Sequence, residues 1–130
     1  MARGSVNDDL EAVITVRVLG GNGIELDVDA ILDTGFTGSL TLPKSIVDQL
    51  GFASPIRGLA RMADGTISEF DVFEAEVMLD QGWVTIFVSA VGRHPLIGMT
   101  LLAGHLIKIG VEPGGDVEIT PLQNLAADAP

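Results

Sequence analysis

Alternating apolar and polar residues recur along the chain, and this period of two predicts β-strands. The clearest case is residues 24–32, where apolar side chains take every second position and acidic side chains lie between them. The apolar positions are Ile24, Leu26, Val28, Ala30 and Leu32, and the acidic positions are Glu25, Asp27 and Asp29. We therefore interpret Asp27 and Asp29 as the solvent-facing side of a strand whose other side faces the core.

Further apolar runs, bounded by glycine, proline and other turn residues, predict a mostly antiparallel β domain with two short helices. Strands are expected at residues 12–19, 24–32, 40–42, 56–62, 67–79, 83–91, 106–111 and 117–120, and helices at residues 43–50 and about 100–105. We expect the domain to span residues 12–122, between a flexible N-terminal segment at 1–11 and a flexible C-terminal tail at 123–130.

The composition argues against several classes of function. The chain has 130 residues, a length typical of one domain, and its 18 acidic and 7 basic side chains give a formal net charge of -11 at pH 7. So few Lys and Arg side chains argue against a nucleic-acid partner, and no apolar run approaches the ~20 residues that span a bilayer. There is no cysteine, and the polar start lacks the apolar stretch of a signal peptide. We therefore expect a cytoplasmic location and no membrane partner.

Catalytic chemistry is indicated where the alternation stops, at Asp33-Thr34-Gly35. An apolar strand delivers a carboxylate there directly into a glycine-containing loop, whose backbone donors can hold and tune a catalytic acid. The tripeptide alone is equally compatible with a plain turn, in which Asp and Gly are favoured residues. The surrounding sequence decides which interpretation to prefer.

That surrounding sequence resembles the retropepsin-like (clan AA) aspartic proteases, in particular their small single-domain prokaryotic type. Their signature is an apolar pair, Asp-Thr-Gly and then small or hydroxylated residues, and residues 31–39 here have the sequence ILDTGFTGS. A second signature, two apolar residues and a glycine before a short helix, is matched by Leu96-Ile97-Gly98. Between the two, the predicted turn at Ala63-Asp64-Gly65 occupies the interval in which the family places a hairpin flap. The resemblance covers roughly residues 12–112.

The resemblance implies an all-β, single-lobe acid-protease fold, a closed β-barrel with one or two short helices. It implies an aspartic-type endopeptidase with Asp33, Thr34 and Gly35 as its catalytic residues. Carboxylate-catalysed peptide hydrolysis needs two carboxylates that share one proton. Because the chain has a single Asp-Thr-Gly, the family solution is a homodimer in which each chain supplies one aspartate.

The same resemblance assigns the remaining site residues and the partners. It implies substrate contacts for Phe36, Thr37 and the flap tip at Ala63, Asp64 and Gly65, and a structural role beside the site for Leu96, Ile97 and Gly98. The expected partners are a second copy of the chain and a peptide or protein substrate. No cofactor and no metal are expected.

Two departures from the family pattern leave a second function open. Phe36 follows Gly35 where many members carry a small residue, and Met99-Thr100 stand where retroviral members carry an arginine that braces the dimer. The alternative is a catalytically weak or inactive dimeric binding module with the same fold. A third possibility, a carboxylate-metal hydrolase, needs more ligands near Asp33 than the sequence offers. Because a dimer joins two chains of -11 each, we also expect tighter association at about pH 4 to 6 than at pH 8.

Overall fold

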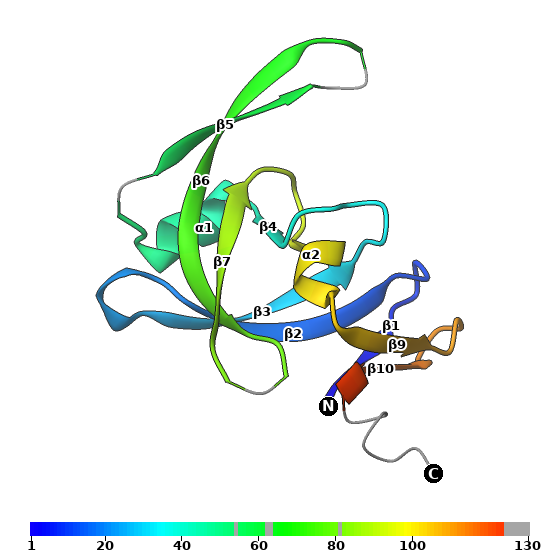
Figure 1. The fold of residues 1–130 in the computed structure, drawn as a ribbon. Coiled ribbons are helices and arrows are strands. Elements are labelled where there is room, and N and C mark those ends of the chain that lie inside the picture. Colours follow the sequence, from blue (N-terminus) through cyan, green and yellow to red (C-terminus); the bar gives the residue numbers. More distant parts are fainter. Residues whose placement is uncertain (54, 62–63, 81, 124–130) are drawn as a thin grey trace.

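The structure, a computed structural model, describes residues 1–53, 55–61, 64–80 and 82–123 (Figure 1). Its strands are β1 (Ala2–Val6), β2 (Ala12–Leu19), β3 (Glu25–Leu32), β4 (Leu40–Leu42), β5 (Ile56–Arg61), β6 (Ile67–Met78), β7 (Val84–Ala90), β8 (Leu96–Ile97), β9 (His105–Ile109) and β10 (Asp116–Pro121). The helices are α1 (Lys44–Leu50), α2 (Met99–Leu102) and a 3-10 turn, η1 (Gly21–Gly23). Within the described residues, the strands form one sheet in the order β5-β6-β7-β4-β8-β3-β2-β1-β10-β9. The predicted, mostly β fold is therefore confirmed.

The sheet curves around a single apolar core. Strand β6 pairs with β7 and also with β2, where Val18 lies opposite Val77. This second pairing brings distant strands of the sheet together, so that their apolar faces look inward. The fully buried large side chains are Ile14, Val16, Val18, Leu40, Leu42, Leu50, Val77, Val88, Ile97, Val117 and Ile119. Beyond this core, the hairpin of β5 and β6 stands away from the rest of the molecule, at the top of Figure 1.

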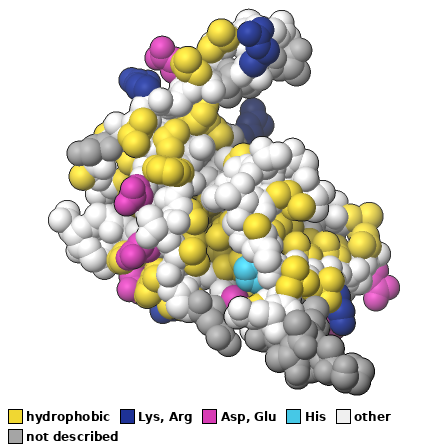
Figure 2. All heavy atoms as spheres, viewed as in Figure 1, with side chains coloured by type: hydrophobic (Ala, Val, Ile, Leu, Met, Phe, Trp, Pro, Cys, Tyr) yellow, Lys and Arg dark blue, Asp and Glu magenta, His cyan; other side chains and the backbone are white. Residues whose placement is uncertain are grey.

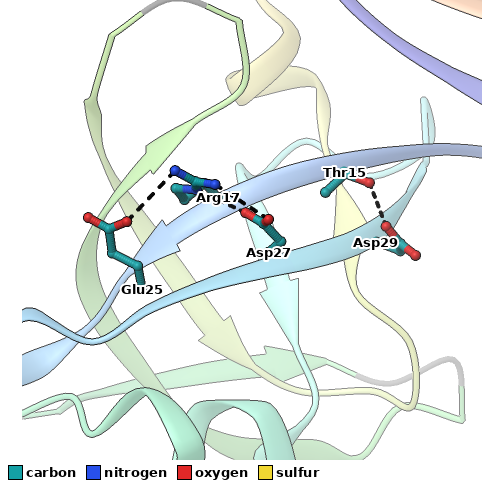
Figure 3. Close-up of polar contacts among 5 residues, drawn as sticks. All are labelled: Thr15, Arg17, Glu25, Asp27 and Asp29. Atoms are coloured by element: carbon teal, nitrogen blue, oxygen red, sulfur yellow. Dashed lines mark hydrogen bonds and ion pairs between the residues drawn. The ribbon is translucent and has the colours of Figure 1, made fainter.

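The outward face of β2 and β3 carries the acidic residues of the alternating segment (Figure 3). Arg17 lies opposite Asp27 in the register, and its Nε donates to Asp27 Oδ1 at 2.9 Å. This hydrogen bond and the charge of Arg17 hold the pKa of the Asp27 carboxyl below its usual range. Two pairs further along, on the same face, the Thr15 hydroxyl donates to Asp29 Oδ1 at 2.6 Å. The interpretation of Asp27 and Asp29 as a solvent-facing side is confirmed, since both are exposed.

The start of the chain differs from the sequence-based expectation. Residues 1–11 were expected in a flexible segment, but residues 2–6 form β1, which is hydrogen-bonded to β2 on one side and β10 on the other. The strand forms because these neighbours satisfy its backbone groups and because Val6 is buried in the core. The expected C-terminal tail at 123–130 lies, apart from Gln123, outside the described residues.

The helix expected at about 100–105 is shorter than predicted. α2 ends at Leu102, and His105 already begins β9. The Nδ1 atom of His105 lies 3.1 Å from the carbonyl oxygen of Leu102 and 3.0 Å from that of Ala103, so the imidazole covers the end of the helix. No helix in the described part of the chain has both the length and the apolar character required to cross a membrane.

Candidate active site

Asp33 lies at the point where β3 ends and is held there by backbone hydrogen bonds. Leu32 pairs with Ile97 across the parallel strands β3 and β8, and the Asp33 N–H donates to the Ile97 carbonyl at 2.9 Å. The Gly35 N–H donates to Asp33 Oδ1 at 2.9 Å, and the Phe36 N–H donates to the Asp33 carbonyl at 3.2 Å. These bonds fold the chain back immediately after the strand. They fix the half-buried Asp33 side chain at the edge of the core.

The loop that follows Asp33 is fastened to a segment about sixty residues further along the chain. The N–H groups of Gly98, Met99 and Thr100 donate to the carbonyl oxygens of Ser39, Phe36 and Gly38 at 3.0, 2.8 and 3.1 Å. The Thr100 hydroxyl also donates to the Thr37 carbonyl. The structure therefore brings together Asp33-Thr34-Gly35 and Leu96-Ile97-Gly98, the two segments that the sequence singles out.

Gly98 lies at a close contact between these two segments. A Cβ atom at this position would stand 2.1 Å from the carbonyl oxygen of Gly38 and 2.5 Å from a ring carbon of Phe36. A Cβ at Gly38 would likewise stand 2.5 Å from the Phe36 ring. The aromatic ring of Phe36 therefore packs against two positions, Gly38 and Gly98, that only glycine fits. The ring and the two glycines form one packed unit that joins the Asp33 loop to the start of α2.

A pocket of about 610 Å³ opens beside this unit. Its lining comes from the Asp33 loop, from β4, from the hairpin strand β6 and from the end of β7, and consists of Phe36, Thr41, Ser68, Glu69, Phe70, Ser89, Ala90, Val91 and Gly92. Thr41 is buried, and its hydroxyl oxygen accepts a hydrogen bond from the Leu96 N–H at 3.2 Å. This hydrogen bond links β4, in the wall of the pocket, to β8, whose Ile97 carbonyl accepts the hydrogen bond from the Asp33 N–H.

Sequence reasoning missed most of this lining. Only Phe36 belongs to the predicted site. Ser89 lies opposite Val72 in the pairing of β7 with β6, and Ser68 and Phe70 lie on β6 just beyond that pairing. One signal was available: Ser68 and Phe70 alternate along the strand that follows the flap turn, and therefore share one face of it.

The hairpin of β5 and β6 carries the predicted flap tip. Asp64 and Gly65 lie in its turn, with Gly65 at a φ of 89°, while Ala63 lies outside the described residues. Both the hydroxyl and the N–H of Thr66 donate to Asp64 Oδ1, at 2.7 and 2.9 Å. These bonds, the hydroxyl first, hold the pKa of the Asp64 carboxyl below its usual range. Below the turn, Arg57 bridges to Glu69 and Asp71 at 3.8 and 3.6 Å.

Two residues beside Asp33, Thr34 and Thr37, are exposed. Within the described residues, no three His, Asp or Glu side chains are placed so that they could hold a metal ion. The hydrogen bonds and ion pairs of those residues join Asp33 to backbone groups and to no second carboxylate. One chain therefore presents one carboxylate, a fixed loop, a pocket and a projecting hairpin.

The whole fold is similar to a solved structure, a retropepsin-like aspartic protease from Rickettsia conorii. The similarity covers 91% of this chain and 91% of that chain, with a TM-score of 0.56 and 17% sequence identity. No sequence-family model matches the chain, and no curated protein matches it in sequence. The chain thus has a retropepsin-like fold, as the resemblance of its motifs predicts.

Proposed function

We propose that the protein is an aspartic endopeptidase whose active site is formed by the Asp33 carboxylates of two identical chains. One observation carries the proposal: Asp33 is fixed at a strand end by Ile97 and Gly35, and its loop lines an apolar pocket together with the projecting hairpin. The retropepsin-like fold and the Asp-Thr-Gly signature also support the proposal. We also infer that the sheet closes into a single-lobe barrel, since β6 returns to pair with β2.

In the proposed mechanism the two carboxylates share one proton, because like charges about 3 Å apart cannot both ionise. The ionised carboxylate removes a proton from a water molecule, whose oxygen forms a bond to the scissile carbonyl carbon. The protonated carboxyl gives its proton to the carbonyl oxygen. The carboxyl that took the proton from water then donates it to the amide nitrogen, the C–N bond breaks and the amine leaves. A hydroxyl proton of the tetrahedral intermediate passes to the other carboxylate as the new carboxylic acid forms, which restores the shared proton.

The neighbouring residues have supporting roles in this proposal. Gly35 allows the loop backbone to approach and donate to Asp33, and the exposed Thr34 hydroxyl bonds to the facing loop of the partner. The hairpin tip at Asp64 and Gly65 closes over the substrate and excludes water. The pocket between Phe36 and Phe70 takes an apolar side chain next to the scissile bond.

The test compares the intact protein with Asp33→Asn on an unfolded protein substrate, across about pH 3 to 7. Asp29→Asn is the matched control, because Asp29 is exposed on the strand that leads to Asp33 and, among the described residues, its side chain bonds only to the Thr15 hydroxyl. We expect cleavage by the intact protein and by Asp29→Asn, and none by Asp33→Asn. Equal cleavage by the Asp33 variant, or no cleavage by the intact protein at any pH, would refute the proposal.

Phe36 favours a second candidate function. Its ring packs on Gly38 and Gly98 and lines the pocket, where it restricts the space for a substrate side chain. In this alternative the dimer binds extended peptides without cleaving them. Binding of an uncleaved peptide at unchanged affinity by the intact protein and by Asp33→Asn would favour the binding module over the protease.

A further inference from the structure

A second pocket, of about 600 Å³, lies between β7, α2 and β9 and shares no lining residue with the pocket beside the Asp33 loop. Residues 84–87 of β7 line one side of it, and Thr100, Leu101 and His105 line the other. β7 and α2 lie at the centre of Figure 1, and Figure 2 shows hydrophobic side chains over α2 and β9. The mechanism proposed above makes no use of this pocket.

Asp80, between β6 and β7, contributes a buried carboxylate to the pocket. Its side chain is 6% exposed, and its Oδ1 atom lies 2.5 Å from the Met1 ammonium group. No hydrogen bond from any other described residue reaches that oxygen. Because a buried carboxylate is costly without a cation or hydrogen-bond donors, the ammonium group compensates its charge. The pocket therefore contains a carboxylate that an α-ammonium group can reach.

His105 adds a second hydrogen-bond acceptor to the pocket. Its Nδ1 atom lies within hydrogen-bond distance of the carbonyl oxygens of Leu102 and Ala103, which can only accept, so Nδ1 carries a proton. In the neutral imidazole the other nitrogen, Nε2, is then an acceptor. The carboxylate of Asp80 and the imidazole of His105 are thus two groups that favour a cationic donor.

The β7 side of the pocket offers apolar surface and an open strand edge. Val84 is 48% exposed and Phe87 is 56% exposed. Within the described residues, β4 pairs only with residues 88–90 of β7, so residues 84–87 have a hydrogen-bonded neighbour on the β6 side alone. Their remaining backbone groups can pair with another extended segment, as a free strand edge does when it binds a peptide.

We propose that this pocket binds the first residues of a peptide that has a free N-terminus and an apolar first side chain. The α-ammonium group pairs with Asp80 and donates to His105 Nε2, the apolar side chain packs against Phe87, and the backbone extends along the edge of β7. The Met1 contact is an internal example of the same pairing, and Met1 itself does not line the pocket. The net charge of -11 also favours a cationic ligand. This binding requires neither Asp33 nor a dimer.

The probe is leucyl-glycinamide, and its N-acetylated form is the matched ligand control, since it keeps the apolar side chain and lacks the ammonium group. Binding is followed by proton–nitrogen correlation NMR at about pH 7, where an ordinary α-amino group is mostly protonated. The variants are Asp80→Asn and Phe87→Ala. Asp116→Asn is the control for general attraction to acidic groups: Asp116 is exposed and lies at the other end of β10 from Pro121, about 17 Å from that lining residue.

We expect saturable shifts in residues 84–87 and 100–105, and an affinity at least about tenfold higher for the free amine than for the acetylated probe. Asp80→Asn should abolish this preference, Asp116→Asn should keep it, and Phe87→Ala should weaken both probes. Equal binding of the two probes, or the absence of shifts in both walls, would overturn the proposal. If Asp80→Asn does not fold, the comparison of the two probes on the intact protein and on Phe87→Ala still decides.

Discussion

Replacement of Gly98 by alanine tests the packing that fixes Asp33. The added Cβ would stand 2.1 Å from the Gly38 carbonyl oxygen, whereas real Cβ contacts essentially never fall below 3.0 Å. Because the obstacle is backbone, the loop that carries Asp33 must move away by about 1 Å. That movement disrupts the three backbone hydrogen bonds between residues 98–100 and residues 36–39.

The expected loss of stability follows from those three bonds. At roughly 0.5–1.5 kcal/mol each, they amount to about 3 kcal/mol. In a chain of this length that corresponds to a fall in Tm of about 10 °C. Gly110→Ala is the matched control, since a Cβ there has its nearest neighbour at 3.7 Å and φ is not in the left-handed region. It should change stability by less than about 1 kcal/mol, in the stabilising direction if at all.

Urea unfolding at one fixed protein concentration measures both variants, with the single Trp83 as a fluorescence reporter and far-ultraviolet circular dichroism as a second probe. We expect Gly98→Ala to lower the midpoint strongly and Gly110→Ala to leave it nearly unchanged. A Gly98→Ala protein within about 1 kcal/mol of the intact one would refute the packing described here. So would equal losses in the two variants.

Three further results are expected. Phe36→Ala should enlarge the pocket and shift cleavage toward bulkier side chains beside the scissile bond, at a cost in stability of about 2 kcal/mol for a half-buried ring; an unchanged cleavage-site profile on a protein digest would contradict this. Thr66→Val should raise the pKa of Asp64 toward its ordinary value, as followed by carboxyl carbon NMR, because the largest cause of its lowering is the Thr66 hydroxyl. Because the pKa of Asp64 is lowered, its ionised carboxylate stabilises the flap turn at any pH above the ordinary pKa, and this stabilisation is lost as the pH falls through the lowered pKa. Finally, two chains of -11 carry a formal -22 at pH 7 (2 × -11), so at low salt the dimer should be tighter at about pH 4 to 6 than at pH 8, and a dissociation constant that is flat across that range would exclude self-repulsion as a factor.

The elements with local signals were predictable from the sequence. Strand β3 follows from the alternation that begins at residue 24, and α1 follows from Pro43 and Gly51 at its two ends. Gly51 ends the helix with a φ of 62°, a conformation that costs glycine nothing. In both segments the deciding contacts lie within a few residues, so the pattern alone contains them.

Strand β1 was not predictable because its partners lie elsewhere in the chain. Gly4, at its centre, suggests a break in a strand. In the structure a Cβ at Gly4 would stand 1.9 Å from the Val13 carbonyl oxygen, so glycine is what allows β1 to lie against β2. On its other side β1 pairs with β10, where Ile119, from the far end of the sequence, lies opposite Ala2. Such non-local pairing leaves no local trace.

The candidate site, too, was predictable only where its signal is local in the sequence. The Asp-Thr-Gly and Leu-Ile-Gly segments were found through a family resemblance, and no local pattern predicts that Ile31 lies opposite Leu96 in a parallel pair. The pocket lining from β6 and β7 was missed for the same reason, since Phe70 and Ser89 meet only once the sheet has formed. What the sequence predicted was the carboxylate and its loop; what it lacked was the surroundings of that loop.

Whether two Asp33 side chains act together is tested most directly by mixing the intact protein with Asp33→Asn. The total chain concentration is held constant, above the dimer dissociation constant, and the chains are allowed to exchange before cleavage of an unfolded protein is measured. If each active site needs an Asp33 from both chains, the rate falls with the square of the intact fraction, to about one quarter in an equal mixture. A linear fall, to about one half, would mean that each chain acts alone and would contradict a site shared across the dimer.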